Sequence, residues 1–279
     1  MESNCITLDY SKQKEFDFYF CSDVHSESIN FDRELFLAEM NEAKNKNAII
    51  HIGGDFWSLI SPKDFKRYTA SNDTISIDGL INRLLRDGEK LLTPYVDNIH
   101  FISTGNHETS YLKYHGVDIT LFLVDRLNRI RSKNLPAIIY GGYSGFIRYK
   151  FKWAENGCIK KLDLFYNHGQ GGTAEVTDGI IDLKRRQYVI ADLIWLQHKH
   201  KKVMTTWSKL SLRNNGDVQT TKTIGFITGC FVKSSKYDIN KDGYRINYGE
   251  EKMRTPVTNG GAFLKVLLSP KFTFRLTLT

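Results

Sequence analysis

The sequence has few of the features that mark membrane, secreted or fibrous proteins. No apolar run approaches the roughly 20 residues needed to cross a bilayer, so we expect no membrane association. The first residues, Met1–Cys5, are polar and lack the basic start and apolar stretch of a signal peptide, so we expect none. The cysteines are Cys5, Cys21, Cys158 and Cys230. Because they are scattered and form no CxxC pair, they argue against a disulfide scaffold or zinc ribbon and predict a reducing, cytoplasmic location.

The composition is that of an ordinary globular chain with a modest basic excess. Of the 279 residues, 41% are hydrophobic and 25% are charged, which excludes a disordered, collagen-like or coiled-coil protein. Only five prolines are present, and no repeat or Pro/Gly/Ser-rich linker interrupts the chain, so we predict a single domain over residues 1–279. Lys and Arg outnumber Asp and Glu by 39 to 31, and the net charge of +8 favours a polyanionic partner.

The first half of the chain alternates predicted strands and helices. Short apolar runs that stop at polar turns predict strands at Phe16–Cys21, Ala48–Ile52 and Asn98–Ser103. Apolar positions at helical spacing predict helices at Asp32–Lys46, Asp78–Leu92 and Val117–Ser132, the first with an acidic start and a basic end. This alternation predicts a largely parallel sheet with helices on its faces.

The second half is richer in strands and in tight turns. Strands are predicted at 147–153, 162–166, 262–268 and 272–278, and a hairpin at 202–212 and 218–228 around Asn214–Asp217. These runs predict antiparallel pairing beside the parallel part, with two sheets packed face to face. The part that bears the motifs is residues 16–200, and the strand-rich C-terminal part is residues 201–279.

Polar residues that can bind a metal follow five of the predicted strands. They are Asp23 and His25, Asp55, Asn106 with His107 and Glu108, His168, and His198 with His200. Open α/β sheets place their ligand sites at the carboxyl ends of strands, so these side chains meet if the strands are neighbours. Oxygen and nitrogen ligands of this kind suit Mn, Fe, Zn or Ni, and the absence of cysteine argues against a structural zinc site.

The order of these motifs (DxH, GD, GNHE, H and HxH) resembles the calcineurin-like metallophosphoesterases over Asp23–His200, about two thirds of the chain. The resemblance implies an α/β fold that is a four-layer α/β/β/α sandwich of two mixed sheets, and a cofactor of two divalent metal ions, with Mn first and Fe, Zn or Ni as alternatives. It also implies that one ion is held by Asp23, His25 and His200, and the other by Asn106, His168 and His198. Asp55 then bridges the two.

Phosphate-ester chemistry explains these residue types. Two cations clamp the phosphoryl oxygens and lower the pKa of a bridging water, so that a metal-bridging hydroxide can attack an anionic ester. Asp55 can bridge because a carboxylate has two oxygens, and Asn106 adds a neutral oxygen beside an anionic substrate. His107 is the expected general acid, since an imidazole titrates near pH 6.5 when unperturbed. Glu108 is expected to orient His107 or a ligand. The sequence therefore predicts a metal-dependent phosphoric ester hydrolase.

Two departures from the family pattern bear on the turn geometry and on the substrate. Gln197 stands where the family's last motif usually has glycine, and we expect a slightly altered turn that keeps both histidines. Phe56 and Trp57 follow Asp55, where protein serine/threonine phosphatases have an Asp-Arg pair. This form, in which aromatic residues follow Gly54-Asp55, looks more like the branch that holds double-strand-break-repair nucleases, so we predict a phosphodiesterase or nuclease acting on DNA.

Other functions and contacts stay open at this point. The alternatives are a phosphodiesterase or phosphatase acting on small nucleotides, and a catalytically weak metal-binding scaffold. His115, Lys199 and Lys201 are candidate substrate contacts because they lie near the motifs. The partner expected is a phosphate-ester substrate, with nucleic acid favoured, and nothing in the sequence identifies a protein partner.

Several other segments have an ordinary structural interpretation that we favour. His51 and His100 are expected to pack within or beside strands. Asp238–Gly243 opens like a calcium-binding loop, but its closing glutamate is displaced by one residue, which favours a hairpin turn. Arg148–Trp153 alternates bases and aromatics as a half-buried strand does, although a basic face can also follow a phosphate backbone. Lys184–Arg186 is expected on a solvated helix face.

Overall fold

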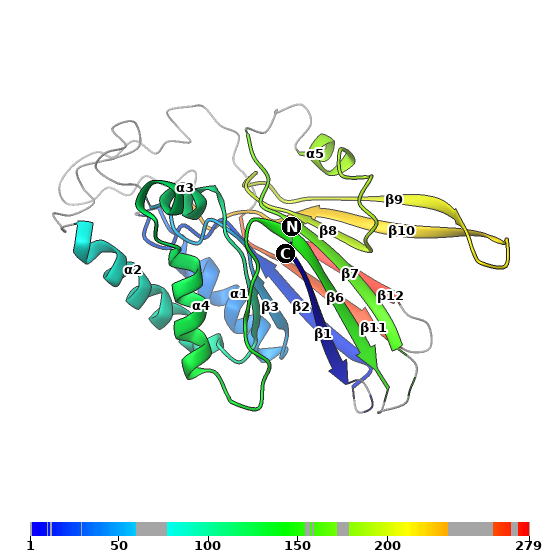
Figure 1. The fold of residues 1–279 in the computed structure, drawn as a ribbon, viewed down its shortest axis with the longest axis horizontal. Coiled ribbons are helices and arrows are strands. Elements are labelled where there is room, and N and C mark those ends of the chain that lie inside the picture. Colours follow the sequence, from blue (N-terminus) through cyan, green and yellow to red (C-terminus); the bar gives the residue numbers. More distant parts are fainter. Residues whose placement is uncertain are drawn as a thin grey trace.

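Two six-stranded sheets lie face to face at the centre of the molecule (Figure 1). The computed structural model describes residues 2–9, 11, 13–28, 30–59, 77–153, 157, 159–171, 179–233, 259–268 and 273–278. Asp238–Gly243, the segment that resembles a calcium loop, and Cys158 lie outside these residues. Within the described part, no helix is both long and apolar enough to cross a membrane.

The first sheet contains the strands that carry the N-terminal motifs. Its order is β12 (Thr273–Leu278), β11 (Ala262–Leu267), β2 (Glu15–Cys21), β3 (Ile49–Ile52), β4 (Ile99–Ile102) and β5 (Ile139–Tyr140). The strands from β2 to β5 are parallel, whereas β11 is antiparallel to both β2 and β12. The first three motifs therefore lie at the carboxyl ends of adjacent parallel strands, as predicted.

The second sheet carries the two later histidine motifs. Its order is β1 (Glu2–Asp9), β6 (Ser144–Lys152), β7 (Ile159–Asn167), β8 (Leu193–Leu196), β10 (Val218–Ile227) and β9 (Val203–Leu212). β7, β8 and β10 are parallel, and β6 and β9 are antiparallel to their neighbours β7 and β10. The predicted hairpin is confirmed as β9–β10, which projects beyond the rest of the sheet (Figure 1).

The side-chain alternation of β2 shows how the layers are built. Phe16, Phe18 and Phe20 point into the core between the two sheets, whereas Tyr19 and Cys21 point into the core under the helices. Because both faces of β2 are covered, an almost uninterrupted apolar run is stable there.

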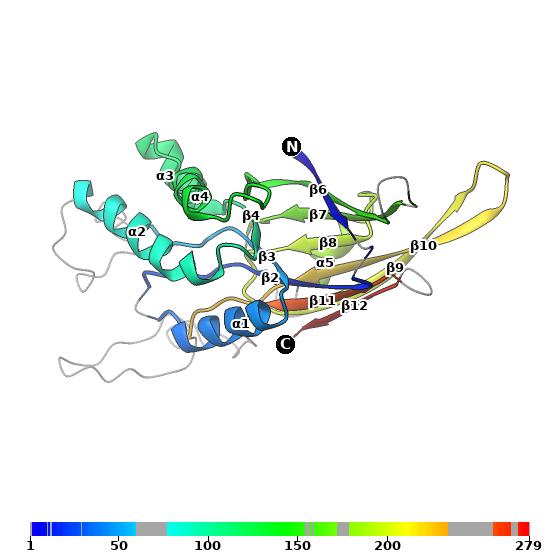
Figure 2. The same ribbon diagram turned by 90° about the horizontal axis from the view of Figure 1, so that it is seen from below.

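Helices cover the outer faces of both sheets. They are α1 (Arg33–Asn45), α2 (Ile77–Leu92), α3 (Asn106–His115), α4 (Ile119–Ile130), α5 (Ile180–Lys184) and a 3-10 turn η1 (Thr93–Tyr95). The helices from α1 to α4 gather on one side of the molecule, as Figure 2 shows. The short α5 covers part of the second sheet, where Leu183 packs against Ile194 and Ile227. The α/β fold with four layers and two mixed sheets is thus confirmed, with a thin outer layer over the second sheet.

Sequence analysis placed the ends of some helices accurately and missed other elements. Asp32 and Asp118 begin α1 and α4 as N-caps, with carboxylates that accept the N–H groups of Leu35 and Leu121. Sequence analysis did not predict β1, the two-residue β5 or α3. The interpretation of His51 is confirmed: it is fully buried between the sheets, against Phe20 and Tyr149.

Candidate metal centre

The motif-bearing turns are aligned with one another by backbone hydrogen bonds. The amide of Asp23 donates to the carbonyl of Gly54 at 2.9 Å, and that of His25 donates to the carbonyl of Asp55 at 3.1 Å. On the other side, the amide of Phe231 donates to the carbonyl of Asp23 at 3.1 Å. The turn after β2 is therefore held between the turn after β3 and the segment that follows β10.

Several of the predicted ligands occupy a backbone conformation that is rare for residues with side chains. Asp23, His25, Asp55, His198 and His200 have φ between 50° and 73°. Such a left-handed conformation costs roughly 1–2 kcal/mol per residue outside glycine. Strain of this kind concentrates where a side chain must be held in one direction for function.

This finding corrects one expectation about the last motif. The sequence suggested that His198 and His200 point the same way from an extended segment. Instead, both have left-handed φ, and Lys199 between them turns away. Gln197 itself is not left-handed, so replacing the family's glycine adds no backbone strain at that position. Both histidines still reach the site.

One group of side chains consists of Asp23, His25 and His200, with one ligand atom from each within 4.8 Å of the others. The His200 Nε2 atom lies 3.3 Å from the Asp23 Oδ1 atom and 3.4 Å from the His25 Nε2 atom. On its far side, the His25 ring contacts the Ser58 hydroxyl, 3.0 Å from Nδ1. Ser58 thus orients a predicted ligand, a role that the sequence gave no signal for beyond its position three residues after Asp55.

A second group consists of Asp23, Asp55, His168 and His198, again within 4.8 Å. The His168 Nε2 atom lies 3.2 Å from Asp55 Oδ2 and 3.0 Å from Asn106 Oδ1, so Asn106 belongs to this side of the site. The His198 Nδ1 atom lies 4.0 Å from Asp55 Oδ2. Asp23 belongs to both groups, so the two groups overlap, and the division into two ligand sets implied by the family resemblance stays a prediction.

Asp55 belongs to the second group and not to the first. It also forms a third group, within the same distance limit, with His25 and His107. Its Oδ1 atom accepts the His107 amide at 3.0 Å, and its Oδ2 atom lies 3.8 Å from the His107 Nε2 atom. The side chain of Asp55 is almost fully buried. Because Asp55 lies near His25 as well as near His168 and His198, its position suits a carboxylate that serves both predicted ions.

The chemistry of the site fits two cations. The Asp23 Oδ1 and His198 Nδ1 atoms are buried and make no hydrogen bond within the described part of the chain, which is costly unless something else binds them. The facing His25 and His200 nitrogens are 3.4 Å apart, close to the roughly 3.0–3.4 Å between neighbouring nitrogens bound at about 2.0–2.1 Å to one ion. Carboxylate, amide and imidazole donors are suited to divalent transition metals.

The electrostatics of the ligands are strongly coupled. Burial alone would raise the pKa of Asp55, but the His168 imidazole holds that pKa well below its usual range. Conversely, burial would lower the pKa of His168, and Asp55 outweighs it and raises the pKa to about 9. Burial, with His200 nearby, lowers the pKa of His25 to about 3, which leaves its nitrogens free of the extra proton. The acidic groups that attract protons here attract cations for the same reason.

Glu108 binds the turns rather than the predicted acid. Its Oε2 atom accepts the amides of Gly105 at 2.8 Å and Asp55 at 3.0 Å, and its Oε1 atom accepts the amide of Trp57 at 3.1 Å. Burial and the nearby Asp55 carboxylate raise the pKa of Glu108 to about 8. Of the two roles expected for it, the contacts favour orienting a ligand, because it fixes the backbone that carries Asp55.

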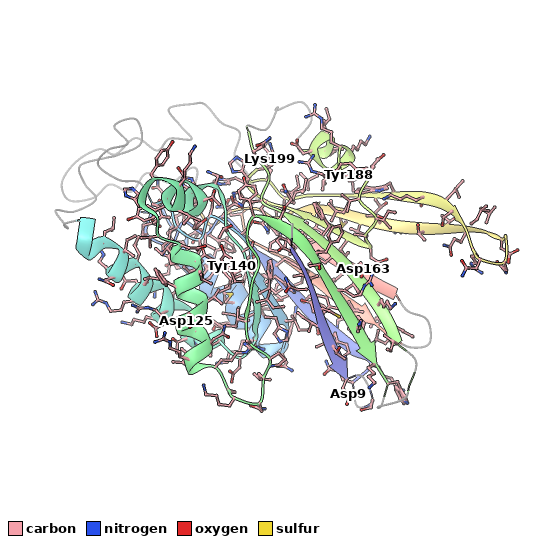
Figure 3. All side chains as sticks on the ribbon, viewed as in Figure 1. Asp9, Asp125, Tyr140, Asp163, Tyr188 and Lys199 are labelled. Carbon is pink, nitrogen blue, oxygen red and sulfur yellow. The ribbon has the colours of Figure 1, made fainter. Side chains whose placement is uncertain are left out.

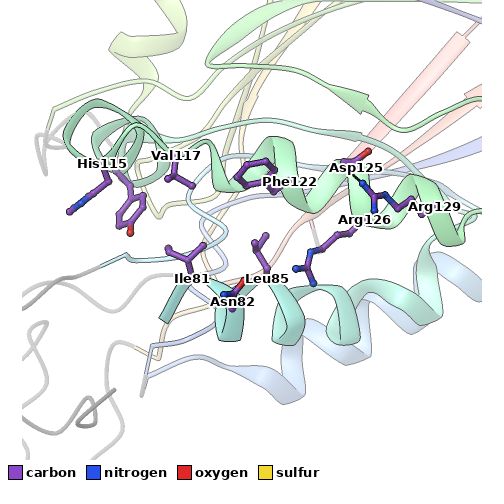
Figure 4. Close-up of a pocket in the computed structure, with 10 residues that line it drawn as sticks. Ile81, Asn82, Leu85, His115, Val117, Phe122, Asp125, Arg126 and Arg129 are labelled. Carbon is purple, nitrogen blue, oxygen red and sulfur yellow. Dashed lines mark hydrogen bonds and ion pairs between the residues drawn. The ribbon is translucent and has the colours of Figure 1, made fainter. Parts of the chain in front are cut away.

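The three candidate substrate contacts lie in different settings. His115 is exposed at the far end of α3, stacked on Tyr111 with ring centroids 4.3 Å apart. It lines an open groove of about 670 Å³ between α2, α3 and α4, away from the metal ligands (Figure 4). Lys201 is half-buried directly after His200.

Lys199 lies beside α5 (Figure 3). Its ammonium donates to the carbonyls of Gln170 at 2.9 Å and Gly171 at 3.0 Å and pairs with Asp182 Oδ2 at 3.3 Å. Its side chain is only 4% exposed, so it ties down the turn after His168 instead of facing an incoming phosphate.

The comparison with protein families agrees with this geometry. The family model described as calcineurin-like phosphoesterase matches residues 16–238. The chain belongs to this family. It is therefore a metal-dependent phosphoester hydrolase of a family that uses two metal ions, and its acidic and histidine clusters are candidates to hold them.

The other comparisons add little. No curated protein matches the sequence. Among solved structures, a conserved uncharacterised protein from Streptococcus pneumoniae TIGR4, named a predicted phosphoesterase, is 10% identical; the match covers 94% of this chain and 98% of that one with a TM-score of 0.31. GAP50 of Plasmodium, named the anchor in the inner membrane complex, is also 10% identical, with 95% and 85% covered and a TM-score of 0.41. With such low TM-scores, neither structure is used to assign a function.

Proposed function

We propose that this protein is a two-metal phosphodiesterase that cleaves DNA, with Mn²⁺ as the first candidate for its ions. The observation that carries the proposal is that Asp55 has ligand atoms of both sets within 4.8 Å, from His25 on one side and from His168 and His198 on the other. Asp23, His25 and His200 would hold one ion, and Asn106, His168 and His198 the other. When bound, the ions would neutralise the phosphate and supply a water of lowered pKa as nucleophile.

We assign the role of general acid to His107, and its surroundings support this. It lies in the first turn of α3, where its amide is fixed on Asp55, and its ring meets the His25 ring edge-on at 5.3 Å between centroids. The His107 side chain is 18% exposed, so its ring borders the ligands and still reaches solvent. From there, its imidazolium donates a proton to the leaving alkoxide. Asp55 and Asn106 would act through the ions that they would hold.

Basic charge on α5 supports a nucleic-acid substrate. α5 is tied to the last motif through the Asp182–Lys199 ion pair, and Lys184 and Arg185 at its end are exposed. With the net charge of +8, this surface suits a phosphate backbone that extends past the cleaved bond. Phe56 and Trp57 are both buried under the helices, so they form no surface for a substrate. They support the nuclease branch only through the sequence motif.

The location proposed is the cytoplasm. Cys5 and Cys21 are free thiols, one exposed and one buried, as is usual for a protein in a reducing compartment.

The test is turnover of DNA, RNA, cyclic nucleotides and an aryl phosphodiester with Mn²⁺, at two salt concentrations. The proposal predicts cleavage of DNA, with a KM that rises steeply with salt. Turnover of a small nucleotide alone, with little salt dependence, would point to the small-nucleotide alternative. Turnover of none of them would point to a metal-binding scaffold.

A further inference from the structure

Gln197 connects the two sheets at the metal centre. Its side chain is completely buried. The Oε1 atom lies 2.8 Å from the amide nitrogen of Gly54, which precedes Asp55, and 3.1 Å from the Nδ1 atom of His168. The same amide oxygen thus contacts Gly54, in the turn after β3 that carries Asp55, and His168, in the turn after β7 of the other sheet.

These contacts fix the proton of His168. A backbone N–H can only donate, so the atom of Gln197 that faces Gly54 must be the carbonyl oxygen. An oxygen can only accept here, so the Nδ1 atom of His168 must carry a hydrogen. In the neutral ring, the lone pair is then on Nε2, the atom that lies 3.2 Å from Asp55 and 3.0 Å from Asn106.

We propose that Gln197 is a positioning residue of the metal centre, which holds His168 in the tautomer that presents Nε2 to an ion and locks it to the Asp55 turn. The proposal rests on the proposed two-metal function. Partners that orient a ligating histidine commonly strengthen metal binding by 10–100-fold. Here the partner is a side chain at a position where the family's motif usually has none.

The local packing shows that Gln197 is accommodated at a cost. A Cβ atom at Gly53 would lie 2.6 Å from the Gln197 Cδ atom, so only glycine leaves room for the amide. The Nε2 atom of Gln197 is buried and has no hydrogen-bond partner within the described residues. An unpartnered buried donor lowers stability. A residue that served only stability would not carry one, which favours a role in orienting the ligand.

Two substitutions separate this role from packing. Gln197→Met keeps the length and removes the acceptor. Gln197→Glu keeps an acceptor for both Gly54 and His168. Gln219→Met is the matched control, because Gln219 lies on β10 and its amide donates to Ser211 at 3.0 Å, away from the site.

The experiment measures Mn²⁺ binding by calorimetry in wild-type protein and the three variants, with thermal unfolding of each metal-free protein. We expect the Kd of one of the two ions to rise about 10–100-fold in Gln197→Met and less than tenfold in Gln197→Glu. The control should match wild type. Nitrogen-15 NMR of wild type loaded with Zn²⁺ should show the His168 proton on Nδ1, and this measurement stands even if a variant fails to fold.

The outcomes distinguish the two proposals. If wild type binds two ions and Gln197→Met binds them equally well, or if the His168 proton is on Nε2, Gln197 does not position the ligand. If wild type binds fewer than two ions, the proposed function itself fails. If two ions bind and Gln197→Met loses one without any phosphodiester being cleaved, the positioning role stands and the catalytic proposal does not.

Discussion

The metal centre and the tip of the β9–β10 hairpin both reverse the chain after a strand, but they do so with different residues. In the hairpin, the left-handed position in the turn is Gly216, with φ of 85°. Seven described non-glycine residues have left-handed φ, and five of them are aspartates and histidines at the metal centre that are assigned as ligands. Where only a turn is needed, glycine supplies it without strain; where a ligand must point inward, the protein accepts strain.

The two regions also differ in how completely their polar groups are hydrogen-bonded. In the hairpin, the amides of Arg213, Gly216 and Asp217 all donate to groups within the turn. At the metal centre, buried atoms of Asp23, Gln197 and His198 are left without hydrogen-bond partners among the described residues. The turn that serves only the fold is satisfied locally, and the turns proposed to serve chemistry leave atoms that a bound ion would satisfy.

The largest expected effect comes from Asp55, the carboxylate proposed to serve both ions. Asp55→Asn keeps the shape but removes the charge proposed to hold them. We expect turnover to fall by at least about 10³-fold and the bound metal to drop below two ions per chain. Metal analysis of the purified protein and kinetics with Mn²⁺ check this. Asp217→Asn, in the hairpin turn, is the control, and equal effects of the two changes would remove the distinction between the regions.

The next effect separates chemistry from metal binding within one helix. His107→Gln should lower kcat by about 10²–10⁴-fold while leaving two ions bound, because only the proton donor is lost. His115→Gln on the same α3 helix should change kcat little, since that ring is exposed and stacked on Tyr111. Steady-state kinetics with a phosphodiester measure both. An unchanged kcat in His107→Gln would exclude it as the acid.

A smaller effect is expected in stability, at the side chain between the last two histidines. Lys199→Met leaves the Gln170 and Gly171 carbonyls and Asp182 without their cation. We expect the free energy of unfolding to fall by about 1–3 kcal/mol. We also expect the ion beside His168 to lose more affinity than the ion beside His25. Urea denaturation of the metal-free protein measures the loss of stability. Lys222→Met, on an exposed hairpin position, should have no such effect, and equal stability of the two variants would contradict the anchoring role.

The smallest effect tests the strain directly. At a left-handed position, glycine is favoured over alanine, so metal-free His198→Gly should be more stable than His198→Ala by roughly 1 kcal/mol. In the middle of α4, at the exposed Asp125, the order should reverse: Asp125→Ala should be more stable than Asp125→Gly by about 1 kcal/mol. Urea denaturation in the presence of a chelator compares the pairs. The same order at both positions would show that His198 is not strained.

Much of the fold could be predicted because its signals are local. Apolar runs that end in polar turns located β2, β3 and β4, and Asn214–Asp217 located the hairpin. α3 was missed because Asn106, His107 and Glu108 resemble a polar turn, although Glu108 at the third helical position accepts the Gly105 amide as a capping residue does. β1 was missed because it is an edge strand with a polar start, which pairs with β6 and packs Ile6 into the core between the sheets.

The sequence predicted which side chains gather at the site, but not the backbone conformation and contacts that hold them there. Motif order indicated the side chains, since each follows a strand. Packing around the strand ends determines the other features of the site. They are the left-handed backbone at His198 and His200, the direction of Lys199 toward Asp182, and the contacts of Gln197. The Gln197–Gly54 hydrogen bond joins residues 143 positions apart, and no local pattern encodes such a contact.

The most direct test is a crystal structure of the protein grown with Mn²⁺, with the ions located by their anomalous scattering. We predict two peaks on either side of the Asp55 carboxylate, one beside His25 and His200 and the other beside His168 and Asn106. A single peak, or ions bound away from Asp55, would contradict the claim that two cations share this carboxylate.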